Sequence, residues 1–379
     1  MEERKQVLWP GARPLIGTVV GVGIFGLPYV FSQAGFVFGL VVLVVIAALS
    51  LLTFFVYADL LEVSQQHVRF VAVVSNQLGP FGRWIATLAY FGSLWGALLA
   101  YIIVGGQLLF NILRPVLAGE IFTYQVIFWL IVSIGMVGGS IFVRRLQSIL
   151  IPIFFVMIAA LTLFALPHLH VDYLIAMEPT NLLLPFGALI FAFSGFSAVP
   201  ECREALGKHK SSLRSALLLG VVLIGAVYAL FSLAVVGMTG PFTSTQAVDG
   251  LRLAMGPEVS TFVSVIGLCT VFTAFISVGN ALTNSLVYDF RGRFLFSWAL
   301  TACVPLAAFL FGARDFIGVI GATGGLLGGL SGVVLLVAYE RARLTAQLPK
   351  RALAVPQAVV ALSFVLFVAM IIITIVGIL

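Results

Sequence analysis

Apolar residues run in long, nearly unbroken blocks along this chain, separated by short polar stretches. The blocks are about 20 residues long and do not alternate with polar residues, so they predict membrane-spanning helices rather than β-strands. We expect an all-α polytopic membrane protein with eleven spans in a single transporter domain, residues 1–379. In chain order the predicted spans are Pro14–Phe31, Phe36–Leu61, Trp84–Leu113, Ile121–Val143, Ser148–Leu166, Leu184–Pro200, Leu217–Met238, Val259–Tyr288, Phe294–Phe311, Phe316–Ala338 and Val355–Leu379.

Two of these blocks are interrupted by glycine and proline, and they lie about half a chain apart. The first interrupted block runs from Pro14 to Pro28, and the second runs from Pro185 to Pro200. A break in a membrane helix leaves backbone groups without partners, and these groups must be satisfied in some other way. Paired interruptions of this kind point to a transporter binding site near the middle of the bilayer.

The two interrupted spans each begin a group of five spans. Because five is an odd number, the second group enters the membrane from the opposite side, which predicts an inverted repeat. We expect repeat one at about 10–167, repeat two at about 181–340 and an extra helix at about 355–379. The mixed apolar and polar segment His67–Gln77 is a candidate for a short amphipathic helix along the inner membrane surface.

Composition and charge agree with a membrane location. The chain is 61% hydrophobic and 9% charged, which no soluble domain of this size matches. With the N-terminus inside, the inner segments hold 17 of the 20 lysines and arginines, leaving only Arg114, Arg252 and Arg314 outside. The positive-inside rule therefore predicts a protein of the cell membrane, with a cytoplasmic N-terminus and an external C-terminus. The net charge of +6 is explained by these inner loops rather than by a nucleic-acid partner.

The breaks themselves offer the clearest chemistry. Backbone N–H groups at the start of a half-helix suit a carboxylate, and freed carbonyls suit a cation. The alternative is that the glycines of Gly17–Gly23 only allow close helix packing. At the second break, Phe191–Phe196, the rings could wall an apolar pocket and Ser194 could offer a hydroxyl, although each ring could equally serve packing. The matching pair of breaks favours binding.

Several other features of the sequence give weaker indications of a binding site. The three cysteines have no metal-ligand spacing, and the glycine-rich run Gly318–Gly332 lacks the ending of a nucleotide-binding loop, so both are interpreted as packing. No ionisable residue lies near a span centre, which argues against a polyamine or arginine as substrate. Glu201 follows the proline that closes the sixth span. It is a candidate for proton relay or gating, with a solvated ion pair as the alternative.

Three strings resemble a known family. The string Ile16–Pro28 resembles the first helix of the amino acid–polyamine–organocation superfamily, and it is most similar to the aromatic amino acid permease branch, which includes tryptophan and tyrosine permeases. Phe191–Glu201 is similar to the sixth helix of that branch, and Ala100–Gly106 is similar to the third. The resemblance covers nearly the whole chain. It implies a secondary active transporter that takes up a neutral, hydrophobic or aromatic amino acid by ion-coupled alternating access.

The resemblance also implies roles for individual residues. The amides of Gly21, Val22 and Gly23 would hold the substrate carboxylate, while backbone carbonyls and a hydroxyl at the second break would face the amino group. Tyr101 on the third span would border the pocket, with packing as its alternative role. The candidate substrate-binding residues are Thr18, Gly21, Val22, Gly23, Tyr101, Phe193, Ser194, Gly195 and Phe196.

A cation site is implied in the same way. In sodium-coupled relatives, carbonyls matching Gly17 and Val20 pair with hydroxyls of the eighth helix, for which Thr273 and Ser277 are the candidates. These two residues are four apart and share a helical face, but their hydroxyls could instead bond to their own helix. Some sodium-independent relatives fill this position with a fifth-helix lysine, and Ser148–Leu166 contains none. Na+ and H+ both stay open as coupling ions, and no other cofactor or metal is expected.

Other classes of function are less consistent with the sequence. A membrane-embedded enzyme needs a buried catalytic group, and the four histidines all fall in predicted loops. A channel would not need an inverted repeat. A transporter-like amino acid sensor, or a carrier of another small organic solute, stays open as an alternative. The expected partners are the substrate and the lipid bilayer, and the sequence does not indicate an oligomeric state.

Overall fold

The computed structural model describes residues 2–64, 69–114, 116–138, 140–176, 181–348 and 355–378. All regular structure within these ranges is helical, which confirms the predicted all-α class. The α-helices are α1 (Glu2–Val19), α2 (Gly23–Ala34), α3 (Phe36–Val63), α4 (Phe70–Leu113), α5 (Ile121–Val137), α6 (Ser140–Ala165), α7 (Val171–Ile175), α8 (Leu184–Ala192), α9 (Val199–Ala205), α10 (Leu213–Thr239), α11 (Val248–Met255), α12 (Pro257–Phe290), α13 (Phe294–Leu310), α14 (Phe316–Ala322), α15 (Gly329–Leu344) and α16 (Gln357–Ile378). Short helical segments are η1 (Leu166–His168), η3 (Phe196–Ala198), η4 (Lys210–Ser212), η5 (Gly240–Phe242) and η6 (Thr323–Gly328).

Eight helical segments of the described ranges are long and apolar enough to cross a membrane. The pair α1 and α2 forms a further candidate span that is bent by 64° at its break. Helices α5 and α13 are also apolar and contain 17 residues each. Each predicted span overlaps one of these elements, while the number of membrane crossings stays a prediction.

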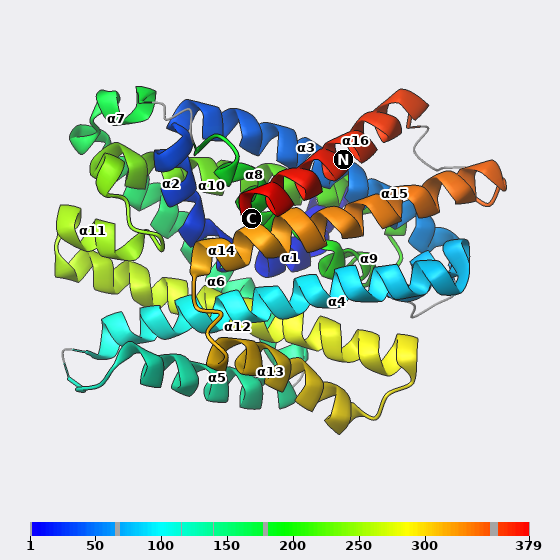
Figure 1. Cartoon of the computed structure of the whole chain (residues 1–379), viewed down its shortest axis with the longest axis horizontal. Helices are drawn as coiled ribbons and strands as arrows, with labels where there is room; N and C mark the ends of the chain where they lie inside the picture. The colour runs from blue at the N-terminus through cyan, green and yellow to red at the C-terminus, as the bar shows by residue number, and fades with distance from the viewer. Residues whose placement is uncertain are drawn as a thin grey trace.

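The helices lie roughly side by side along the long axis of the molecule (Figure 1). The interrupted pairs α1–α2 and α8–α9 occupy the interior, where α1 packs on α9 and α10 and α2 packs on α8. Of the apolar window in Leu184–Ala205, 72% is buried, whereas only 22% of the window in α16 is buried. The broken segments are therefore the core of the protein, and α16 lies at its edge.

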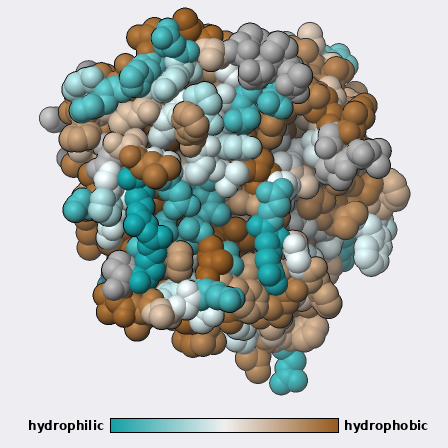
Figure 2. Space-filling model, turned by 60° about the vertical axis from the view of Figure 1, so that its left-hand side comes forward, coloured by the Kyte–Doolittle hydropathy of each residue, from teal (hydrophilic) through white to brown (hydrophobic). Residues whose placement is uncertain are grey.

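Polar residues gather at an end of this bundle. Figure 2 brings the left-hand end of Figure 1 forward and shows polar residues over much of that face, with apolar residues mostly around the rim. Exposed apolar side chains such as Val41, Val44 and Val156 lie along the long helices α3 and α6. Large exposed apolar surfaces on a bundle of this kind suit contact with lipid.

Several helix boundaries differ from the sequence prediction, including the start of α1 at Glu2 rather than Pro14. The span predicted to end at Val143 ends at Val137, and the next helix already begins at Ser140 rather than Ser148. Arg144 and Arg145, which lie between the two predicted spans, belong to α6. In α4, Gly79 has φ 69° and separates a first helical stretch, residues 70–78, from the long helix. This stretch overlaps the predicted amphipathic helix, whose residues 67 and 68 lie outside the described residues.

The glycine-rich run packs tightly, as the sequence indicated. Its centre, η6, is a π-helix that contacts α8. A methyl group added at Gly324 would overlap the carbonyl oxygen of Gly187, and one added at Gly187 would lie 2.7 Å from the Gly321 oxygen. Because these positions lack a side chain, two backbones can approach each other closely. This contact holds α8, the helix that leads into the second break.

Candidate substrate and ion sites at the two helix breaks

The first break lies between the end of α1 at Val19 and the start of α2 at Gly23. The Gly21 amide donates to the Val19 carbonyl oxygen at 2.8 Å. The amides of Val22 and Gly23 have no hydrogen-bond partner within the described part of the chain. The first amides of a helix lack intrahelical acceptors and carry the positive end of the helix dipole. The break therefore presents two donors suited to an anionic group.

The second break lies between Ala192, the last residue of α8, and Phe196, where η3 begins. The Ser194 amide donates to the Phe191 carbonyl at 3.0 Å, and its hydroxyl donates to the Ile190 carbonyl at 2.8 Å. The carbonyls of Phe193 and Ser194 accept no hydrogen bond from the residues that the structure describes. The second break thus supplies acceptors where the first supplies donors.

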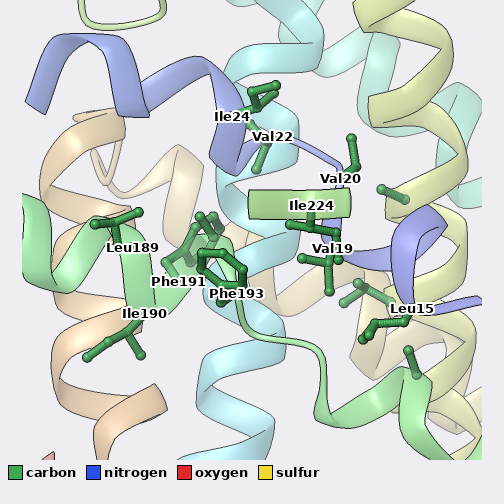
Figure 3. Close-up of a cluster of buried hydrophobic side chains, with 14 of the residues drawn as sticks. Leu15, Val19, Val20, Val22, Ile24, Leu189, Ile190, Phe191, Phe193 and Ile224 are labelled. Carbon is green, nitrogen blue, oxygen red and sulfur yellow. The ribbon is translucent and has the colours of Figure 1, made fainter. Parts of the chain in front are cut away.

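The two breaks touch each other. A methyl group added at Gly23 would lie 2.9 Å from the Cα atom of Ala192. The hydroxyl oxygen of Tyr228, on α10, lies 2.8 Å from both the Val19 and the Ala192 carbonyl oxygens. One hydroxyl hydrogen can be donated to only one of them at a time. Figure 3 shows the apolar side chains of both breaks packed together beside Ile224, which lies on α10 like Tyr228.

Sequence reasoning missed Tyr228. It is fully buried, and it is the only tyrosine of the apolar helix α10. A buried tyrosine hydroxyl normally needs a hydrogen-bond partner, and this requirement was the available signal. Nothing in the local sequence indicated that the partners would be the two breaks.

A small cavity of about 30 Å³ lies beside the breaks. Of the predicted substrate-binding residues, Thr18, Gly23, Tyr101 and Ser194 line it. Phe191 supplies the aromatic ring of the second break that lines the cavity. It belongs to the motif of that break, but it was not among the predicted site residues. The full lining is Thr18, Val19, Gly23, Ser93, Leu94, Ala97, Tyr101, Phe191, Ala192, Ser194 and Val278.

The other predicted substrate residues lie around this cavity. Phe193 packs edge-on against the Tyr228 ring, with ring centres 5.4 Å apart, and Phe196 packs against the rings of Phe54 and Phe70. Neither ring is among the described residues that line the cavity. Gly195 is buried, and a methyl group there would lie 2.7 Å from the Leu15 side chain. Gly21 and Val22 form the backbone of the first break, where a methyl group at Gly21 would lie 2.7 Å from the Tyr101 hydroxyl oxygen.

The predicted cation residues gather on the opposite side of the first break, around a side chain that was not predicted. The Gln147 amide nitrogen donates to the Gly17 carbonyl oxygen at 3.2 Å and to the Ser277 hydroxyl oxygen at 2.8 Å. Val20 and Thr273 line a space of about 10 Å³ beside it. The Thr273 hydroxyl donates to the Thr270 carbonyl at 3.0 Å, which is the alternative that the sequence left open.

Gln147 was missed because of the helix boundary. The sequence placed it in a loop before Ser148, whereas the structure places it eight residues into α6. A glutamine one residue before an apolar span was the available signal. Among the described residues, no group of three or more histidine, cysteine, aspartate or glutamate side chains could hold a metal ion.

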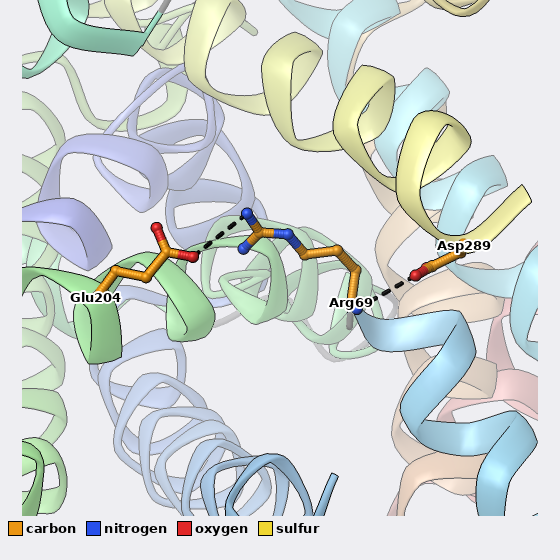
Figure 4. Close-up of polar contacts among 3 residues, drawn as sticks. All are labelled: Arg69, Glu204 and Asp289. Carbon is orange, nitrogen blue, oxygen red and sulfur yellow. Dashed lines mark hydrogen bonds and ion pairs between the residues drawn. The ribbon is translucent and has the colours of Figure 1, made fainter. Parts of the chain in front are cut away.

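Charged residues join helices at the end of the bundle where α4 begins. The Arg69 guanidinium lies 3.5 Å from a Glu204 carboxylate oxygen, and the Arg69 amide donates to the Asp289 carboxylate at 3.3 Å. Figure 4 shows Arg69 lying between α9 and α12. Glu201, the candidate for proton relay, lies on α9 three residues before Glu204. This end of the bundle is tied together just beyond the second break.

Comparisons with known proteins identify the family of the chain. A family model described as the tryptophan/tyrosine permease family matches residues 4–376. The chain is 24% identical over 335 residues to tyrosine-specific transport system 1 of Haemophilus influenzae, covering 81% of each protein. It is 22% identical over 335 residues to glutamine transporter 2 of Aliivibrio fischeri, covering 84% of this chain and 85% of that one.

Solved transporter structures share the fold. MhsT in complex with L-phenylalanine superposes with a TM-score of 0.71 at 14% identity, covering 97% of this chain and 98% of that one. Mhp1, a transporter of the nucleobase-cation-symport-1 family, gives a TM-score of 0.67 at 16% identity, covering 97% of this chain and 89% of that one. Because the family match spans nearly the whole chain, the protein belongs to the tryptophan/tyrosine permease family, and it is a membrane transporter rather than an enzyme.

Proposed function

We propose that this permease takes up a neutral, hydrophobic or aromatic amino acid by ion-coupled alternating access, with the substrate held at the two helix breaks. The observation that carries the proposal is the pairing of donors and acceptors beside one cavity. Unpartnered amides of Val22 and Gly23 stand at the first break, and unpartnered carbonyls of Phe193 and Ser194 stand at the second. A free amino acid carries the complementary carboxylate and ammonium groups.

In this proposal the Val22 and Gly23 amides bind the carboxylate, assisted by the dipole of α2. The Gly21 amide would join them only by giving up its bond to the Val19 carbonyl. Tyr101 and Phe191 are the rings available to an apolar or aromatic side chain. Ligand pockets usually occupy roughly 300–1,000 Å³, so a cavity of about 30 Å³ has to widen when substrate enters. Such a change of shape fits alternating access.

The names of relatives support a neutral amino acid. Two relatives are named as a tyrosine-specific and a glutamine transporter, and MhsT was solved with L-phenylalanine. No Asp or Glu is among the described residues that line the cavity. A cationic side chain would therefore lack a partner there.

We also propose the finer topology. Eleven spans would form a 5+5 inverted repeat plus an extra helix, with a cytoplasmic N-terminus, as the distribution of basic residues favours. A tag placed after Leu379 should then be reached by impermeant reagents added outside intact cells. Protection of that tag from outside would contradict the span count.

Uptake into proteoliposomes tests the function. Labelled tyrosine, phenylalanine and glutamine should accumulate when an ion gradient is imposed, whereas lysine should not. Accumulation requires the imposed gradient if transport is ion-coupled. A sensor would bind one of these amino acids, as seen by a ligand-dependent thermal shift, without accumulating it. Saturable binding with no uptake or exchange would therefore reject the transport proposal.

A further inference from the structure

Gln147 is a buried polar side chain whose position is not explained by substrate binding. It is only 4% exposed, and it lies near the start of α6. Its amide nitrogen donates to Gly17, just before the first break, and to Ser277 in the middle of α12. A carboxamide NH2 group has two hydrogens, so both are used in joining α1 to α12.

The oxygens that receive these two bonds are also suitable ligands for a hard cation. Carbonyl and hydroxyl oxygens are the ligands that hard cations prefer. The space that remains beside Gln147, next to Val20 and Thr273, is about 10 Å³. That is close to the volume needed for a single water molecule. A sodium ion is no larger than water, so size alone does not exclude it. With the glutamine in place, however, the Gly17 and Ser277 oxygens already accept its amide hydrogens and are less able to coordinate a cation.

Apart from Thr270 and Thr273, the rest of the wall of this space is apolar. Leu150, Ile151 and Phe154 form part of its wall, and no Asp or Glu is among the described residues that line it. An ion without a counter-charge is costly to bury, whereas a neutral amide costs little once it is hydrogen-bonded. The glutamine therefore supplies positively polarised hydrogens without adding a charge.

Gly17 makes this contact possible. A methyl group at Gly17 would lie 2.6 Å from the Gln147 side-chain carbon Cδ and 2.8 Å from its amide nitrogen. Any larger residue at Gly17 would push the carboxamide out of its position. The glycine therefore allows the glutamine side chain to reach the backbone of the first break.

We propose that Gln147 is a built-in substitute for a coupling sodium ion, so that the permease holds its first break in a binding-competent shape without sodium. The inference rests on the proposed function, because the same break presents the Val22 and Gly23 amides to the substrate. Gln147 acts through Gly17 as a positioning residue. Shortening or charging its side chain should expose the oxygens of Gly17 and Ser277 and create a cation site.

The first experiment measures sodium binding without substrate. The full chain is purified in detergent, and its thermal midpoint is followed in NaCl and in choline chloride at equal ionic strength. The wild type should show no sodium-specific shift. Gln147→Glu, which keeps the side-chain size but replaces the NH2 group by a carboxylate oxygen, should be stabilised by sodium in a saturable way, because a ligand raises stability by mass action. Gln147→Ala should respond in the same direction.

Gln125→Ala is the matched control. Gln125 is also a buried glutamine, and its amide donates to the Ile103 carbonyl at 3.3 Å, away from the breaks. This variant should lose stability without gaining a sodium response. A sodium-specific shift in the wild type would overturn the proposal. So would the absence of any sodium response in both folded Gln147 variants. If Gln147→Ala does not fold, the nearly isosteric Gln147→Glu decides.

The second experiment measures transport under a fixed pH gradient. Wild-type uptake should be equal with and without sodium. Gln147→Ala should bind substrate about tenfold more weakly in sodium-free buffer, as expected for two lost hydrogen bonds, and sodium should restore the affinity. Sodium-dependent wild-type uptake would overturn the proposal. Failure of the wild type to transport any amino acid would count against the proposed function, whereas the substrate-free thermal titration would still test Gln147.

Discussion

The two sides of the first helix break differ in how the freed backbone groups find hydrogen-bond partners. On the side facing α6 and α12, the carboxamide of Gln147 fills the space and bonds to Gly17. On the side facing α4 and α8, a cavity remains, lined by Thr18, Gly23 and Tyr101. The first side is filled by the Gln147 side chain, whereas the second side has room for a ligand.

This difference shows why a broken helix does not by itself locate a ligand. Freed backbone groups in an apolar environment must find partners, and a side chain such as Gln147 can provide them as well as a substrate or an ion can. The amides of Val22 and Gly23 have no partner within the described residues and still need one. The predictions below test whether the open side binds substrate and the filled side only positions it.

The largest effect is expected from Gly23→Ala, which acts where the two breaks touch. The added methyl group would lie 2.9 Å from both the Cα and the Cβ atoms of Ala192, and a backbone atom cannot move away easily. The added methyl group therefore acts on the second break rather than on a bound carboxylate. Overpacking costs about 1–3 kcal/mol, so uptake should fall roughly ten- to hundredfold in proteoliposomes.

Gly225→Ala is the control for Gly23→Ala. Gly225 lies on α10, and an added methyl group would make only ordinary contacts, the nearest at 3.8 Å from Leu43. Its uptake should match the wild type. Normal uptake by Gly23→Ala would show that the contact between the breaks is not needed for transport.

The second effect in size is expected from Tyr228→Phe, which removes the hydroxyl shared by both breaks. Leaving buried carbonyls of Val19 and Ala192 without this donor should cost about 1–3 kcal/mol. Because the same hydroxyl joins the breaks, the thermal midpoint and the uptake rate should fall together. Tyr124→Phe is the control, since the Tyr124 hydroxyl donates to the Leu117 carbonyl at 2.8 Å, away from the breaks. That variant should lose stability but keep its uptake per folded molecule.

Much of the fold was predictable because it depends on local patterns. Long apolar blocks define the helices, and glycine with proline marks both breaks, Gly17–Gly23 and Ser194–Gly195. The glycine-rich run in α14–α15 was correctly interpreted as packing because it lacks the residues of a nucleotide-binding loop. Each of these features depends on residues that are close together in the sequence.

The parts that could not be predicted depend on contacts between distant residues. Gln147 lies 130 positions from both Gly17 and Ser277, and Tyr228 lies 209 positions from Val19. Neither residue belongs to a motif. Their roles follow from which helices pack together, and periodicity along a single helix carries no information about that. The resemblance to a known family implied roles for the two breaks, but it did not indicate these partners.

A smaller effect is expected on the open side of the break. Tyr101→Phe removes a hydroxyl from the cavity lining and keeps the ring. Ser194→Ala likewise removes a hydroxyl, at the second break. A single hydrogen bond contributes about 0.5–1.5 kcal/mol, so each variant should weaken substrate binding roughly two- to tenfold without lowering the thermal midpoint of the substrate-free protein. Isothermal titration of detergent-purified protein measures both variants. Unchanged affinity in both would argue that the substrate lies elsewhere.

The smallest effect is expected on the filled side. The Thr273 hydroxyl donates to the Thr270 carbonyl of its own helix, so Thr273→Val keeps the side-chain shape and removes a local bond. Such a bond back to the same helix adds little stability, and Gln147 already satisfies the Gly17 carbonyl. Substrate affinity of Thr273→Val should therefore equal that of the wild type in titration. Combined with Gln147→Glu, the same change should weaken the sodium response, because one oxygen beside the vacated position is lost. A strong loss of substrate affinity in Thr273→Val alone would mean that the filled side also contacts the substrate, and the distinction between the two sides of the break would fail.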